Sequence, residues 1–215
     1  MELSLYQIDA FTDDLFSGNP ACVVPLTKML PDTLLLKIAQ ENAVAETAFF
    51  LIKDQKIFLR WFTPEVEMDL CGHATLATAH CLKTILKYSG NIFQFETLSG
   101  ILVVEFKDGL YHLNFPSRMP KKIKLPSLLQ QSINISPVYV FKARDYVLIY
   151  DSEYDIKNIT INRVPFDQLS LGAGGVIVTS EGDSCDFVSR FFTPKASILE
   201  DPVTGSAHCS LIPFW

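Results

Sequence analysis

Glu46, His73 and Asp201 have side chains of the types that move protons in enzymes. Glu46 lies between an expected helix end and an apolar strand, with alanine and phenylalanine side chains around it. Partial desolvation there would raise the pKa of its carboxyl group toward a value that suits a general base. On this segment alone, a solvated loop glutamate is the simpler interpretation.

The other two candidates lie at expected helix starts. His73 follows Gly72, where the helix dipole would lower the pKa of the imidazole and favour a neutral ring that can donate or accept a proton. A capping or packing role accounts for His73 equally well. Asp201 and Ser206 flank the second start, and taken alone they could be an N-terminal cap and an ordinary residue of the first turn.

Gly72 and Gly205 each begin one of these helices. Glycine lets another molecule approach the backbone closely, and the first amides of a helix are unpaired donors. Two such starts directed at one cleft would hold an anion, most simply a substrate carboxylate. Neither segment is a phosphate-binding loop, and Gly172-Ala173-Gly174-Gly175 precedes a strand rather than a helix, so no dinucleotide fingerprint occurs. We therefore expect no cofactor.

The five cysteines form neither a disulfide framework nor a zinc motif. Their number is odd, their spacing is irregular, and no Cys-x-x-Cys occurs. His73 and His80, taken with Cys71 and Cys81, match no common zinc spacing. We therefore expect reduced thiols and no metal site.

The candidate residues belong to a sequence that occurs twice. Arg60-Trp61-Phe62-Thr63-Pro64 returns as Arg190-Phe191-Phe192-Thr193-Pro194, and Gly72-His73-Ala74-Thr75 is echoed by Gly205-Ser206-Ala207-His208. A single repeat at this distance predicts two similar lobes rather than a solenoid. Similar lobes usually face each other across a pseudo-twofold axis, and ligands favour such crevices. The repeat thus predicts both the architecture and the place of the chemistry.

Each expected lobe is a sheet around a central helix. The segment 72–88 is a predicted helix whose small and apolar residues cover most of its circumference, which is typical of a buried helix. Another helix is expected after Pro31 and a short one at 166–169. Strands are expected at 4–11, 21–24, 47–52, 57–62, 92–96, 101–106, 110–115, 138–141, 146–150, 175–179 and 186–192. The predicted fold class is α+β.

A polar, basic and proline-rich stretch separates the expected lobes. We predict an N-terminal lobe over 1–116, a linker over 117–126 and a C-terminal lobe over 127–215. The first copy of the repeat continues for many residues after its glycine-led helix start, whereas the second copy ends soon after its own. If the lobes are alike, the C-terminal lobe is incomplete and lacks roughly 34 residues at its end.

Composition excludes several classes of protein. The chain has 215 residues, of which 48% are hydrophobic, and this is enough for a packed core. Its net charge of −6 disfavours a nucleic-acid partner. No apolar run approaches the roughly 18 residues of a membrane helix, and the first residues lack a signal-peptide pattern. We expect a cytoplasmic protein that binds neither nucleic acid nor membranes.

Six segments in one order resemble the PhzF family, the phenazine-biosynthesis isomerase-like proteins. They are Ile8-Asp9-Ala10-Phe11-Thr12, Phe16-Ser17-Gly18-Asn19-Pro20-Ala21, Glu46-Thr47-Ala48-Phe49, Leu70-Cys71-Gly72-His73-Ala74-Thr75, Ser189-Arg190-Phe191-Phe192 and Glu200-Asp201-Pro202-Val203-Thr204-Gly205-Ser206-Ala207-His208. The resemblance implies the diaminopimelate epimerase-like fold, with two pseudo-symmetric lobes of mixed sheet, each around a central helix. It also implies a cofactor-independent isomerase of a small carboxylic acid, usually a homodimer.

The resemblance also implies roles for individual residues. In the family's namesake, a glutamate removes a proton from a dihydro-hydroxyanthranilate and the proton returns at another carbon. Carried over, Glu46 is that base, and His73 and Asp201 are catalytic residues that assist it. The implied substrate-binding residues are Asn19, Gly72, Thr204, Gly205 and Ser206.

The sequence is also compatible with two other functions. The same fold could serve a non-catalytic interaction protein, because a fold does not by itself determine function. A thiol-dependent amino-acid epimerase could use Cys71, since a thiol beside a helix start can be acidic enough to abstract a proton. That mechanism needs a second thiol, which the stretch 201–204 lacks, and Cys209 lies past the helix start. A two-thiol mechanism is therefore disfavoured.

Overall fold

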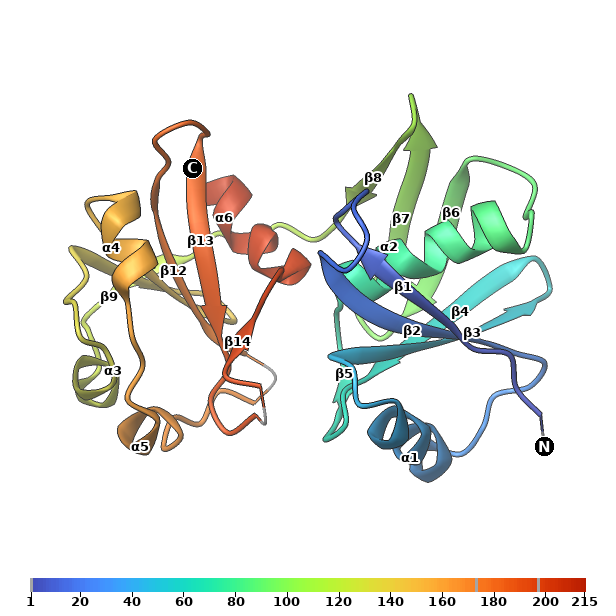
Figure 1. The fold of residues 1–215 in the computed structure, drawn as a ribbon, viewed down its shortest axis with the longest axis horizontal. Helices are drawn as coiled ribbons and strands as arrows, with labels where there is room; N and C mark the ends of the chain where they lie inside the picture. The colour runs from blue at the N-terminus through green and yellow to red at the C-terminus, as the bar shows by residue number, and fades with distance from the viewer. Residues whose placement is uncertain (1, 173, 197) are drawn as a thin grey trace. The chain divides into compact units, whose positions relative to one another are not determined.

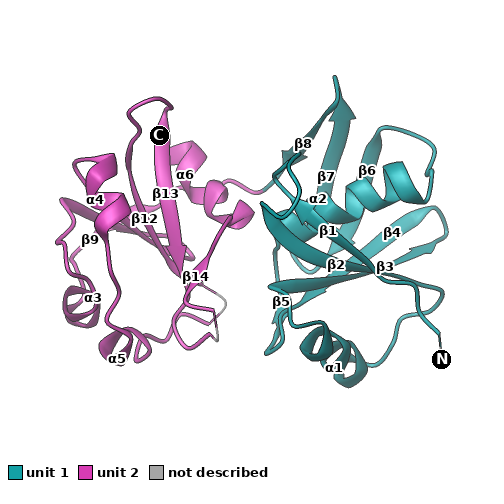
Figure 2. Ribbon diagram, in the orientation of Figure 1, with its two compact units in different colours: residues 1–115 teal, residues 116–215 magenta. Residues whose placement is uncertain are grey.

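The computed structural model describes residues 2–172, 174–196 and 198–215. The chain divides into two compact units, residues 1–115 and residues 116–215 (Figure 2). Each unit has its own sheet and its own buried core. Among the described residues, no helix combines the length and the apolar composition that a membrane crossing requires.

Unit 1 is a mixed eight-stranded sheet with strand order β1-β2-β3-β4-β6-β7-β8, and β5 pairs with β4. Its strands are β1 (Tyr6–Ala10), β2 (Asn19–Leu26), β3 (Glu46–Lys53), β4 (Lys56–Phe62), β5 (Glu67–Met68), β6 (Ile92–Thr97), β7 (Gly100–Lys107) and β8 (Leu110–Asn114). The pairs β2–β3 and β4–β6 are parallel, and the other pairs are antiparallel. The parallel pairing of β2 with β3 needs a crossover, and helix α1 (Asp32–Asn42) supplies it.

Helix α2 (Gly72–His80) is the centre of unit 1. It packs on β1, β2 and β3 at one end of the strand order and on β8 at the other, so the sheet curves around it (Figure 1). Seven of its nine residues are buried, which confirms the buried helix expected from its composition. Only small residues, such as Ala74 and Ala77 with no exposed surface, let the sheet approach on several sides.

The predicted helix 72–88 is shorter and less regular than expected. After His80 the chain widens into the π-helical segment η1 (Cys81–Ile85), and the Leu86 amide donates to the Cys81 carbonyl at 2.9 Å. The Thr84 hydroxyl also donates to the His80 carbonyl at 2.6 Å. Such side-chain bonds compete with the regular backbone ladder and loosen it, which accounts for the change.

Unit 2 is a six-stranded sheet with strand order β14-β13-β12-β11-β10-β9. Its strands are β9 (Lys121–Ile123), β10 (Tyr139–Lys142), β11 (Tyr146–Ile149), β12 (Val176–Glu181), β13 (Phe187–Phe192) and β14 (Glu200–Asp201). Among the strand pairs described for this unit, β11 and β12 are parallel and the others are antiparallel. Strand β9 lies within the stretch 117–126, for which the sequence predicted a linker.

Helices cover both faces of the unit 2 sheet. They are α3 (Ser127–Ser132), α4 (Glu153–Asn158), α5 (Arg163–Phe166), the 3₁₀ turn η2 (Gly205–Ala207) and α6 (His208–Phe214). Along β11, Tyr146 and Leu148 join the core formed with α3, α4 and α5, while Val147 and Ile149 pack with Ala207 and Leu211 on the other face. Because both faces of this strand are buried, its sequence is a continuous run of apolar residues. The second glycine-led helix begins as the 3₁₀ turn η2. The short helix expected at 166–169 is displaced, because α5 ends at Phe166 and shares only that residue with the prediction.

The repeated sequence builds the same ion pair in each unit. In unit 1, Arg60 donates to Glu67 from Nε and Nη2, both at 2.7 Å. In unit 2, Arg190 makes the same two bonds to Glu200, again at 2.7 Å. Each arginine joins the long strand to the short strand beside it, β4 to β5 and β13 to β14. The two units therefore share a local design, as the repeat predicts.

Candidate active site

Glu46 and His73 come together in unit 1. Glu46 is the first residue of β3, and His73 is the second residue of α2. Because α2 packs on β2 and β3, the imidazole Nε2 lies 3.3 Å from Glu46 Oε2. The side chains are 2% and 14% exposed respectively. Glu46 is therefore mostly withdrawn from solvent rather than a solvated loop residue.

Burial lowers the pKa of His73 to about 4. The lowering was predicted from the helix dipole, but its main cause is the removal of the ring from water. His73 is therefore neutral at pH 7, and one ring nitrogen can donate while the other accepts. Its Nδ1 lies 3.6 Å from the Cys71 Sγ.

The Nε2 atom of His73 is buried without a hydrogen bond, although it is close to Glu46. The two atoms are therefore close to each other, but the contact is not aligned as a hydrogen bond. A buried polar atom without a partner is uncommon and often belongs to a functional site. A bound group that reaches Glu46 would meet this nitrogen as well.

The remaining unit 1 candidates border this pair in the fold. Gly72 begins α2, and its neighbour Cys71 occupies the position before the helix. Asn19, with 1% exposure, is the first residue of β2, the strand that pairs with β3 beside Glu46. Gly18 before it has a φ of +75°, and a Cβ there would lie 2.4 Å from the Ala10 carbonyl oxygen. Glycine is thus required where the chain turns into β2.

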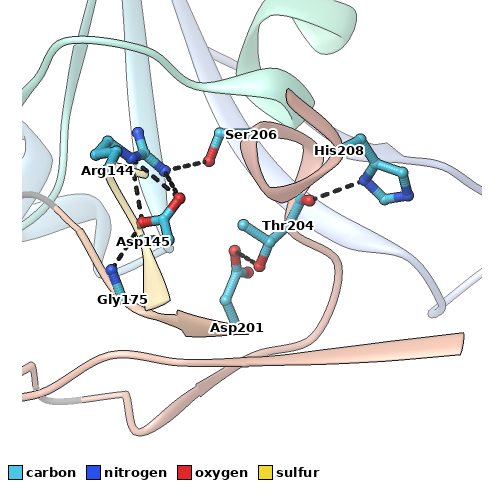
Figure 3. Close-up of polar contacts among 7 residues, drawn as sticks. All are labelled: Arg144, Asp145, Gly175, Asp201, Thr204, Ser206 and His208. Atoms are coloured by element: carbon cyan, nitrogen blue, oxygen red, sulfur yellow. Dashed lines mark hydrogen bonds and ion pairs between the residues drawn. The ribbon is translucent and has the colours of Figure 1, made fainter. Parts of the chain in front are cut away.

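Unit 2 gathers the second set of candidates around η2 (Figure 3). The Thr204 hydroxyl donates to Asp201 Oδ2 at 2.5 Å, so Asp201 accepts from this side chain just before the turn. Gly205 begins η2, and Ser206 follows it with 8% exposure. The hydroxyl oxygen of Ser206 accepts a bond from Arg144 Nη2 at 2.9 Å.

Sequence reasoning missed Arg144 and Asp145, which the tertiary structure brings to Ser206. Asp145 is 1% exposed and accepts from Arg144 Nη2 at 3.0 Å and from the Gly175 amide at 2.8 Å. The available signal was an arginine and an aspartate directly before the apolar run that forms β11. Charged residues at the start of a fully buried strand must be paired, and that requirement marks them for attention.

One group of side chains has the composition of a metal site. The possible ligand atoms of Glu46, Cys71 and His73 all lie within 4.8 Å of one another. However, Nε2 of the ring faces Glu46 while Nδ1 faces Cys71. One ion would use only one ring nitrogen, so it could not take part in both of these contacts. His80 and Cys81 are not part of this group.

Comparisons with known proteins identify the family. The family model described as phenazine biosynthesis-like protein, PhzC-PhzF, matches residues 8–215. The chain belongs to the PhzF family. An uncharacterized isomerase of Pseudomonas aeruginosa is 44% identical over 216 residues, which cover this whole chain and 82% of that relative.

Solved structures agree with the family assignment. A PhzF family protein from Enterococcus faecalis matches with a TM-score of 0.90 and 43% identity, over all of this chain and 82% of that one. A probable proline racemase from Agrobacterium radiobacter matches with a TM-score of 0.58 and 10% identity, over 99% of this chain and 76% of that one, which shows the fold alone. The two-lobe α+β fold predicted from the sequence is thus confirmed, and the chain is a PhzF-like isomerase.

Proposed function

We propose that the protein moves a carbon-bound proton on a small carboxylic acid, with Glu46 as the base. The observation that carries this proposal is the contact between Glu46, at the start of β3, and His73, at the start of the buried helix α2. Both side chains have little exposed surface. A carboxylate in such a place can take a proton from carbon, and a neutral imidazole beside it can orient or relay that proton. The relatives' description as isomerases agrees with this chemistry.

The reaction conserves protons and electrons within the substrate. Glu46 takes a proton from a carbon that is conjugated with the substrate carboxyl group, and the electron pair left behind spreads onto the carboxyl oxygens. Amide donors of the first turn of α2, which begins at Gly72, stabilise the charge that develops. The proton then returns from Glu46 to a different carbon, so the bond pattern shifts without an oxidant or a reductant.

The other candidates bind or orient the substrate in this proposal. His73 is neutral at pH 7, which lets it exchange a proton without carrying a permanent charge. Asn19 and Gly72 of unit 1 and Thr204, Gly205 and Ser206 of unit 2 are the proposed substrate-binding residues. Asp201, held by the Thr204 hydroxyl, is the proposed second catalytic carboxylate.

Exchange of a carbon-bound proton with deuterium from the solvent tests the proposal. We expect wild-type protein to exchange a proton of a suitable unsaturated or cyclic carboxylic acid, followed by NMR. Glu46→Gln keeps the size of the side chain but removes the base, and should slow exchange by about 100-fold or more. Glu41→Gln, an exposed glutamate of α1, is the matched control and should leave the rate unchanged. Exchange that survives in Glu46→Gln would contradict the role of Glu46.

A thiol mechanism has one observation in its favour, the 3.6 Å contact between Cys71 Sγ and His73 Nδ1. The internal repeat argues against it. The strand registers make Glu67 equivalent to Glu200, and counting onward places Thr204 at the position of Cys71. Unit 2 therefore offers a hydroxyl where a two-thiol epimerase needs its second sulfur.

A further inference from the structure

We propose that Arg144 is a positioning residue that turns the Ser206 hydroxyl into a fixed hydrogen-bond donor for the anionic group of the substrate. The inference rests on the proposed function, because it assumes that Ser206 binds the substrate. It adds a residue of unit 2 that the sequence did not suggest.

The direction of one hydrogen bond carries the argument. Arginine has only donors, so the bond of 2.9 Å between Arg144 Nη2 and Ser206 makes the serine oxygen the acceptor. The hydrogen of the serine hydroxyl must then point away from the guanidinium. A hydroxyl that accepts from a cation is polarised and becomes a stronger donor itself. Ser206 is therefore prepared to donate to an incoming anion.

Asp145 holds the guanidinium in place. Arg144 donates to it from Nε at 3.1 and 3.2 Å and from Nη2 at 3.0 Å (Figure 3). The carboxylate also accepts from the Gly175 amide at 2.8 Å, which ties it to the start of β12. With 1% exposure for Asp145, the pair is screened little by water. The planar fork of arginine is needed here, because a lysine ammonium cannot make these bonds and reach Ser206 together.

The internal repeat explains why unit 2 has the Arg144–Asp145 pair at this place. Thr47 pairs with Phe62 in unit 1, and Val176 pairs with Phe192 in unit 2, so Gly175 takes the place of Glu46. No side chain fits there, because a Cβ on Gly175 would lie 2.3 Å from the Phe191 ring.

Unit 2 instead brings a charged group from the neighbouring strand end. The same register places Asp145 opposite Gly175, as Ala21 lies opposite Glu46 in unit 1. In each unit, a side chain near the start of a strand thus contacts the residue that follows the helix glycine. In unit 1, Glu46 contacts His73. In unit 2, Arg144 contacts Ser206. The group is the carboxyl group of Glu46 in unit 1 and the guanidinium of Arg144, paired with the Asp145 carboxylate, in unit 2.

A matched pair of ligands tests the inference by equilibrium binding. The probes are 2-aminobenzoate, whose fluorescence reports binding, and its neutral counterpart 2-aminobenzamide. We expect wild-type protein to bind the acid more tightly than the amide. Arg144→Lys and Ser206→Ala should each weaken binding of the acid by about 10-fold or more and leave the amide unaffected, since bonds to charged groups have this strength. The double variant should be no weaker than either single variant, because both changes remove one coupled interaction.

Two further variants make the test specific. Arg163→Lys alters a partly exposed arginine of unit 2 that pairs with Asp167, and it should bind the acid as the wild type does. Asp145→Asn leaves Arg144 in place but loosens it, and should give a smaller loss of the same sign. It serves as the second variant if Arg144→Lys does not fold, which circular dichroism shows.

Several results would overturn the inference. They are equal binding of acid and amide by the wild type, unchanged binding of the acid by Arg144→Lys, and additive losses in the double variant. Glu46→Gln separates this inference from the proposed function, because it should slow exchange by about 100-fold or more yet still bind 2-aminobenzoate. Binding that depends on Arg144 without Glu46-dependent exchange would retain the anion site and reject the base.

Discussion

The imidazole Nε2 of His73 lies 3.3 Å from Glu46 Oε2, although the two residues belong to different elements and are far apart in the sequence. The helix that carries His73 is buried on most sides, so the ring is held against β3 rather than in water. The pair therefore combines a carboxylate with a neutral imidazole. A carboxylate and a neutral imidazole in contact are able to take and relay a proton.

The buried His73 ring should make the protein less stable in acid. Its pKa is lowered in the folded state, so the unfolded chain binds a proton first as the pH falls. Stability that is fully present above about pH 6.5 is lost between there and about pH 4. Urea unfolding at a series of pH values measures the effect. His73→Asn should unfold with a flatter pH dependence in this range, and an unchanged slope would show that the ring does not titrate as described.

The two arginines of the repeat should differ in their importance for stability. Arg190 also donates from Nη1 to the Ile156 and Ile159 carbonyls at 2.8 and 2.9 Å, whereas the Nη1 of Arg60 donates to the exposed Asp32. Arg190→Lys should therefore lower the free energy of unfolding by about 1–3 kcal/mol, and Arg60→Lys by less. Chemical denaturation of both variants makes the comparison. Equal losses would mean that the two carbonyl bonds contribute nothing.

Gly175 should not accept even alanine. The added Cβ would lie 2.3 Å from Phe191 Cζ and 2.8 Å from the Phe192 carbonyl oxygen, both in the buried part of β13. We expect Gly175→Ala to destabilise the protein by about 1–3 kcal/mol through overpacking. Gly109→Ala is the control, because its φ of +81° is strained but nothing lies within 4 Å of its Cβ, and it should cost about 1 kcal/mol. A smaller loss for Gly175→Ala than for Gly109→Ala would argue against the described packing.

The cysteines should react very unequally with a thiol reagent. Cys185 is exposed, whereas Cys22, Cys71, Cys81 and Cys209 are buried. Native protein should therefore show one fast-reacting thiol, and Cys185→Ser should remove it. Cys71→Ser should retain deuterium exchange within about 10-fold of the wild type, because Glu46 rather than the thiol is the proposed base. Loss of exchange in Cys71→Ser that matches the loss in Glu46→Gln would instead support the thiol mechanism.

The sequence by itself determined the elements whose signals are local. The repeated Arg-aromatic-Phe-Thr-Pro segments become equivalent strands with equivalent ion pairs, as the repeat predicts. The apolar, alanine-rich segment after Gly72 becomes a buried helix because its composition permits no other stable placement. The motif set was also sufficient for the family, which the family model confirms.

Tertiary structure decided the details that depend on contacts between distant residues. The widening of the helix at Cys81–Ile85 depends on backbone competition that composition does not reveal. The segment Lys121–Ile123 forms a strand because it pairs with the edge of β10, although its polar sequence predicted a linker. Arg144 meets Ser206 only because β11 and the turn before α6 are neighbours in the folded unit. Local sequence sets each segment's own preferences, but the charge, burial and pKa of a site arise from neighbours that only folding brings together.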